Sequence, residues 1–115
     1  MNNKVELIGN IVNDLKYYDI KNNEQMVCFT LATNESYKNK EGEKVETSDF
    51  HSIIVFNKYF VKLSQNLQKG DRLYLIGKLK YTKYIDKNGN DAYRTNVVVD
   101  NAGAFYVIKR FSQEG

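Results

Sequence analysis

The spacing of apolar residues constrains the fold of this chain more than any other feature of its sequence. Apolar and polar residues alternate with a period of two in several stretches, a pattern typical of half-buried β-strands, and the main ones are 4–12, 26–32, 48–56, 73–84 and 93–99. Between the third and fourth of these, Phe60, Leu63 and Leu67 fall at helical spacing, and Lys69-Gly70 supplies a basic last turn and a helix-stopping glycine. The pattern therefore predicts three strands, one short helix and two further strands.

This order of elements is that of a five-stranded OB-fold barrel, an all-β Greek-key fold with one short helix. Gly9 interrupts the first strand, as expected where a barrel strand carries a bulge or a tight bend. Asn88-Gly89 is a hairpin signal and joins the last two main strands into a long hairpin. A further short strand is expected at 105–108. We predict one domain over 1–110, followed by a short end over 111–115.

Several classes of protein are disfavoured by what the sequence lacks. No apolar run approaches the roughly 20 residues of a membrane span, and no secretion signal precedes Val5, so we expect a cytoplasmic protein without a membrane partner. The single cysteine and the single histidine leave no cluster for a disulfide, a metal or another cofactor. His51 and its neighbour Ser52 point to opposite faces of a strand, and no nucleophile motif occurs, so no catalytic residue is predicted.

The central strand at 48–56 has two faces of different character. Phe50 and Phe56 share one face, whereas Ile53 and Val55 share the other with His51. We interpret the aliphatic side as core and the aromatic side as a platform on which nucleobases stack. The strand alone leaves burial of both faces as an equal alternative.

Positive charge is concentrated in the predicted final hairpin. From Lys69 to Arg94 there are seven basic residues against three acidic ones, an excess of four that exceeds the net charge of +3 for the whole chain. Tyrosines are interleaved with this charge, which favours a nucleic-acid surface. The predicted phosphate contacts of this hairpin are Lys69, Lys78, Lys80, Lys83, Lys87 and Arg94. By contrast, 37–46 mixes lysines with glutamates and is predicted to be a solvated loop.

Five blocks of the chain resemble the bacterial-type single-stranded DNA-binding proteins in order and spacing. They are 3–10, 31–37, 49–58, 69–79 and 84–99. The resemblance implies that four rings stack on bases, namely Tyr37, Phe50, Phe56 and Tyr84. It also implies phosphate contacts by Lys38, Lys40, Lys58, Lys69, Lys80 and Lys83. Tryptophan, the usual stacking residue of the family, is absent, and Asn96 stands where the family commonly has glutamate.

The resemblance further implies the partners and the assembly. We expect sequence-independent binding and protection of single-stranded DNA during replication, repair or recombination, by a homotetramer or less favourably a dimer. His51, Tyr74 and Ile76 are the predicted interface residues. The family's acidic tail is not found in 111–115, so no recruitment of replication enzymes through such a tail is expected, and the localisation is nucleoid-associated, with a phage, plasmid or organelle origin also open.

Two other functions remain open at this point. A primosome-type OB protein acts chiefly as a dimeric adaptor, and an OB module can also serve only for contacts between proteins. The fold alone does not separate these from a single-strand binder, because OB barrels carry many functions.

Overall fold

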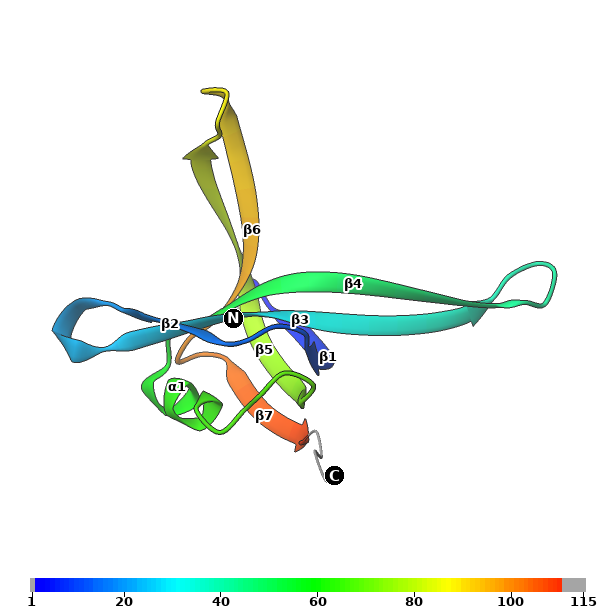
Figure 1. The fold of residues 1–115 in the computed structure, drawn as a ribbon, viewed down its shortest axis with the longest axis horizontal. Coiled ribbons are helices and arrows are strands. Elements are labelled where there is room, and N and C mark those ends of the chain that lie inside the picture. The colour runs from blue at the N-terminus through cyan, green and yellow to red at the C-terminus, as the bar shows by residue number, and fades with distance from the viewer. Residues whose placement is uncertain (1, 111–115) are drawn as a thin grey trace.

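The computed structural model describes residues 2–110, which form a sheet-rich fold with one short α-helix (Figure 1). The elements are β1 (Val5–Ile11), β2 (Lys16–Asp19), the 3-10 turn η1 (Lys21–Asn23), β3 (Gln25–Lys38), β4 (Lys44–Val55), α1 (Lys58–Ser64), β5 (Arg72–Ile85), β6 (Asp91–Val99) and β7 (Ala104–Lys109). The short end predicted at 111–115 lies outside the described residues. Within those residues, no helix is long and apolar enough to cross a membrane.

Five strands close into a barrel, as the sequence predicts for an OB-fold. The neighbours run β1-β3-β4-β6-β5, and β5 pairs back to β1 over Val5–Asn10. β2 extends the sheet beside β3, and β7 pairs with the first part of β5, Arg72–Ile76. The prediction of an OB-fold is confirmed, whereas β2 was missed because 16–19 carries no alternating apolar pattern.

Gly9 does not form a bulge in the pairing of β1 with β5, one of the two roles predicted for it. The pairing of β1 with β5 passes through Gly9 without a shift in register. A Cβ atom at Gly9 would lie 2.3 Å from the carbonyl oxygen of Ala32 on β3. The glycine is therefore required because the backbones of β1 and β3 approach closely at this point.

One parity of side chains fills the barrel. Each ladder among β1, β3, β4, β5 and β6 pairs residues of equal parity, so odd-numbered side chains share the interior. The fully enclosed aliphatic residues are Ile11, Val27, Leu31, Ile53, Val55, Leu73, Leu75 and Val99. The aliphatic side of the central strand is thus core, as predicted.

The helix closes one end of this core. It begins at Lys58, two residues earlier than the apolar spacing suggests, because the Asn57 side chain caps it by accepting from the backbone N–H groups of Tyr59 and Phe60. Val61 is buried in the core, and Phe60 stacks on Phe105 of β7 with ring centroids 5.9 Å apart.

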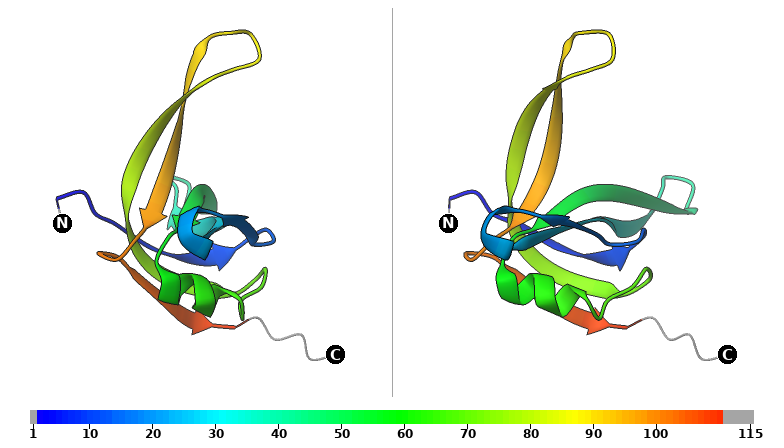
Figure 2. Two further views of the ribbon diagram at one scale, coloured as in Figure 1. Left: turned by 90° about the vertical axis from the view of Figure 1, so that its left-hand side faces the viewer. Right: turned by 60° about the vertical axis from the view of Figure 1, so that its left-hand side comes forward.

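Two long hairpins project from the barrel in different directions (Figures 1 and 2). We call β3–β4 the acidic arm and β5–β6 the basic arm, for the charges discussed below. The prediction that 37–46 is a loop is wrong, since Tyr37 pairs with Val45 and Lys38 with Lys44, and only 39–43 connects the strands. The strand pattern was hidden because both faces of this arm are in water, and no apolar alternation marks it.

Candidate nucleic-acid interface

A continuous outer face crosses β4, β6 and β5. Ile54 of β4 is level with Val98 of β6, and Val98 and Asn96 of β6 are level with Lys78 and Lys80 of β5. Because the paired residues have equal parity, even-numbered side chains of all three strands point away from the core together. We define this outer face by its members Phe50, Ser52, Ile54, Val98, Asn96, Arg94, Lys78, Lys80, Thr82 and Tyr84.

Three of the predicted stacking rings lie on or beside this face. Phe50 is 66% exposed, Tyr84 42% and Phe56 39%. Phe56 follows directly after β4, where its backbone N–H donates to the carbonyl oxygen of Val99 at 2.9 Å. None of the three is a core residue, so burial of both faces of the central strand is excluded.

A shallow groove of about 310 Å³ runs along the outer face beside Phe56. It is lined by Ile54, Phe56, Lys78, Lys80, Asn96, Val98 and Asp100. Inside it, Lys78 Nζ lies 3.1 Å from Asp100 Oδ2. The hydrogen bond from Lys78, followed by that from the backbone N–H of Ala102, lowers the pKa of Asp100. Lys78 is therefore already paired, while Lys80 remains exposed at the groove.

Arg94 lies over the ring of Tyr84, with its guanidinium carbon 5.2 Å from the ring centroid. The two are diagonal neighbours, because Tyr84 is opposite the small Ala92 and Arg94 is opposite Thr82. A guanidinium at this distance is attracted to the ring face. The residue predicted as a phosphate contact thus also covers one side of a predicted stacking ring.

Two predicted site residues lie on the opposite face. Tyr37 is paired with Val45 and shares the odd parity of Ile53, so the ladder separates it from Phe50. Lys83 likewise has odd parity, and its Nζ is 3.2 Å from Asp91 Oδ2. Tyr37 is nevertheless 55% exposed.

The remaining predicted phosphate contacts are exposed outside the strands of the outer face. Lys38 ends β3, Lys40 is in the connecting loop, and Lys58 begins α1. Lys69 precedes β5, and Lys87 is in the turn between β5 and β6.

Four groove residues were not predicted as site residues, namely Ile54, Asn96, Val98 and Asp100. Parity within each strand was visible in the sequence, but the register that joins the strands was not. The basic arm also exposes Tyr81, Ile85 and Tyr93 on the face opposite Tyr84.

The predicted interface residues divide between two faces. Tyr74 and Ile76 have even parity on β5, where the Tyr74 ring stacks on Tyr106 of β7 at 6.0 Å. The Tyr74 hydroxyl donates to Glu6, and this hydrogen bond raises the pKa of Tyr74. His51 instead has the core parity and is half-buried, with Nε2 3.0 Å from the Thr33 hydroxyl.

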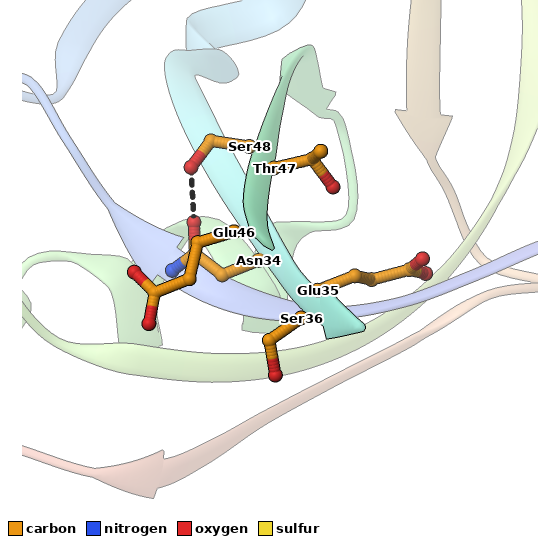
Figure 3. Close-up of a pocket in the computed structure, with 6 residues that line it drawn as sticks. All are labelled: Asn34, Glu35, Ser36, Glu46, Thr47 and Ser48. Carbon is orange, nitrogen blue, oxygen red and sulfur yellow. Dashed lines mark hydrogen bonds between the residues drawn. The ribbon is translucent and has the colours of Figure 1, made fainter. Parts of the chain in front are cut away.

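The acidic arm carries a second, polar hollow (Figure 3). Its lining residues are Asn34, Glu35, Ser36, Glu46, Thr47 and Ser48, and Ser48 donates to Asn34 Oδ1 at 2.6 Å. Glu35 and Glu46 point to opposite sides, so they do not form a carboxylate pair for acid–base chemistry (Figure 3). No cluster of three metal-ligating side chains occurs between residues 2 and 110.

Known proteins match this chain over most of its length. The model of the Single-strand binding protein family matches residues 2–105. A solved structure described as the Plasmodium falciparum SSB complex with ssDNA is 27% identical, with a TM-score of 0.85, and the match covers 93% of this chain and 95% of that chain. A deletion mutant of the single-stranded DNA binding protein from Thermus aquaticus is 18% identical, with a TM-score of 0.71. That match covers 90% of this chain and 50% of the other, and it supports the fold alone.

Proposed function

This chain belongs to the single-strand binding protein family, and we propose that it binds single-stranded DNA without sequence preference and protects it in replication, repair or recombination. The observation that carries the proposal is the outer face, where exposed rings and lysines lie on one continuous surface. Bases offer their flat faces only when they are unpaired, so stacking selects single strands over duplex. The neighbouring lysines neutralise phosphates regardless of sequence.

We place the path of the strand along this face. Phe50, Phe56 and Tyr84 supply stacking surfaces, and Lys80 at the groove and Lys58, two residues after Phe56, contact phosphates. Tyr37 and Lys83 belong to the site if the strand passes around the edges of the arms to their other faces. Lys38, Lys40, Lys69, Lys78, Lys87 and Arg94 complete the proposed set of cationic contacts.

A titration with single-stranded and duplex DNA of the same length, repeated over a series of salt concentrations, tests the function. We expect the single strand to bind more tightly at every salt concentration, and log affinity to fall linearly with log salt. Equal affinity for the two forms would refute selection by stacking. Absence of binding to both would instead favour an OB module that serves only protein contacts.

We also propose that the protein assembles as a homotetramer through the outward side of β1, β5 and β7. Ile8 is 48% exposed and Tyr106 61%, and Ile8 lies level with Tyr74 on the neighbouring strand. Such an apolar surface is suited to burial between copies of the chain. Ile76 lies on the same side, and a role of His51 in the contact remains a prediction. Light scattering is expected to give the mass of four chains, and a monomer at micromolar concentration would contradict the proposal.

The proposed function implies a location in the cell and a mode of action. We propose that the protein acts in the cytoplasm, at the nucleoid, and that it works by binding alone, without catalysis or a cofactor. Incubation with labelled DNA and Mg²⁺ is expected to return the DNA uncut, and the appearance of shorter products would contradict this.

A further inference from the structure

Asn96 is an amide side chain enclosed in the floor of the groove. It has even parity on β6, so it points to the outer face rather than into the core, and it is level with Lys80. Nevertheless it is only 7% exposed, because it lies in the groove beside Phe56, Ile54 and Val98. An amide in such a position requires hydrogen bonds to offset its removal from water.

No hydrogen bond joins the Asn96 carboxamide to another of the described residues, although the other buried polar side chains, Ser64 and Asp71, are partnered. Within residues 2–110, every completely buried side-chain nitrogen or oxygen atom has a hydrogen-bond partner. The amide atoms must therefore reach the groove. Asn96 presents one donor group and one acceptor there, both available to a ligand.

We propose that Asn96 binds the edge of an unpaired nucleobase that is stacked on Phe56. The inference rests on the proposed function and adds a hydrogen-bonding subsite to it. The apolar walls from Ile54 and Val98 and the ring of Phe56 suit a flat heterocycle, and a carboxamide matches the adjacent donor and acceptor atoms along its edge. Rotation of the amide exchanges its two ends, so every base finds a partner and binding stays tolerant of sequence.

The charges in the groove favour a base over a phosphate at this subsite. Asn96 is neutral, and Lys78 is held by Asp100, whose carboxylate repels anions. Lys80 is exposed beside the groove, where it is available to the phosphate of the same nucleotide. The groove thus holds the uncharged part of the nucleotide and leaves the charged part at its rim.

Two substitutions and two DNA probes test this subsite. Asn96→Leu keeps the approximate size of the side chain and removes both hydrogen-bonding groups, while Asn96→Asp leaves acceptors only. The probes are oligo(dT) and an alternating d(GT) oligonucleotide of equal length. Asn96→Leu is expected to weaken binding to both by about three- to tenfold, with the salt slope unchanged, because a hydrogen bond and no charge is lost.

Asn96→Asp is expected to shift base preference. A carboxylate accepts two hydrogen bonds from the adjacent N–H groups of guanine, whereas thymine sets a carbonyl beside its single N–H. The ratio of d(GT) to oligo(dT) affinity should therefore rise by about fivefold or more relative to wild type. The matched control is Thr95→Val, one residue away on the opposite face of β6, which should leave both affinities unchanged.

The outcomes separate this inference from the proposed function. The subsite would be overturned if Asn96→Leu bound DNA as wild type does, or if Asn96→Asp lost affinity equally for both probes. In either case, binding by the wild-type protein would still support the proposed function. Failure of the wild-type protein to bind either oligonucleotide would overturn both. Thermal melting of each variant checks that the barrel is intact.

Discussion

The two arms are built alike. In the acidic arm the Asn39 side chain accepts from the backbone N–H groups of Glu41 and Glu43, and in the basic arm Asp86 accepts in the same way from Asn88 and Asn90. Each turn then places a glycine in the left-handed region, Gly42 at φ 79° and Gly89 at φ 78°. The same local chemistry therefore closes both hairpins.

Their charges are opposite. Residues 34–49 of the acidic arm carry three lysines against five carboxylates, while 78–94 of the basic arm carry five cationic residues against two carboxylates. Lys38 and Lys40 are thus predicted phosphate contacts among acidic neighbours, whereas Lys80 and Lys87 are in a positive field. The backbone therefore sets the shape of an arm, and the charges of its side chains decide whether it attracts a polyanion.

Removal of lysine charges should produce the largest difference between the two arms in DNA affinity. Replacing Lys80, Lys83 and Lys87 by Ala should reduce the slope of log affinity against log salt by about 0.7 for each lysine, the single-strand value per neutralised phosphate. At 0.1 M salt this corresponds to an affinity loss on the order of a hundredfold. Single-stranded DNA titrations over a salt series measure both quantities, and Lys80→Ala alone should account for about 0.7 of the slope.

The matched control replaces Lys38, Lys40 and Lys44 by Ala in the acidic arm. Each triple variant removes one lysine held in an ion pair, Lys83 with Asp91 and Lys44 with Glu46. We expect the control to lose about tenfold or less in affinity at the same salt concentration. Equal losses would mean that the charge difference between the arms does not govern binding.

Removal of an exposed ring should produce the second-largest difference in DNA affinity, between Phe50 and Tyr37. Phe50→Ala removes a stacking surface and no charge, so it should weaken DNA binding by roughly 1–3 kcal/mol without changing the salt slope. Tyr37→Ala on the opposite face should cost about 1 kcal/mol, the lower end of that range. Both affinities are measured by titration with one oligonucleotide.

Thermal melting is the control for these two variants. Phe50 is 66% exposed, so its removal opens no cavity and the melting temperature should stay near that of wild type. A larger affinity loss for Tyr37→Ala than for Phe50→Ala would show that the strand follows the other face of the acidic arm.

Substitutions in the two turns should differ least in their effect, which is on the free energy of unfolding, since the turns are alike. Gly42→Ala and Gly89→Ala should each cost about 1 kcal/mol in the free energy of unfolding, because an alanine is strained at positive φ. A Cβ atom would meet nothing within 4 Å at either position, so the backbone strain is the whole effect. Denaturant unfolding measures both variants. If the losses in the free energy of unfolding for the two variants differed by more than about 1 kcal/mol, the turns of the two arms would not be equivalent.

Much of the fold could be predicted from local sequence patterns. The alternation around Ile53 and Leu75 placed these residues in the core, where both are fully buried, and the helical spacing of Phe60 and Leu63 located the helix. Asn88-Gly89 marked the turn of the basic arm. The outer part of the acidic arm, predicted as a loop over 37–46, was missed because its charged residues face water on both sides, and its turn at Asn39 does not carry the Asn-Gly pair.

Which side chains of one strand share a face can be predicted from the sequence, because alternation is a property of each strand alone. Which faces of different strands adjoin depends on the register between strands, since a slip of one residue would move every side chain to the other face. That register joins Phe50 and Tyr84 on the outer face and separates Tyr37 from them. It also places Asn96 beside Phe56 in the groove, a relation between residues 40 positions apart that no local pattern encodes.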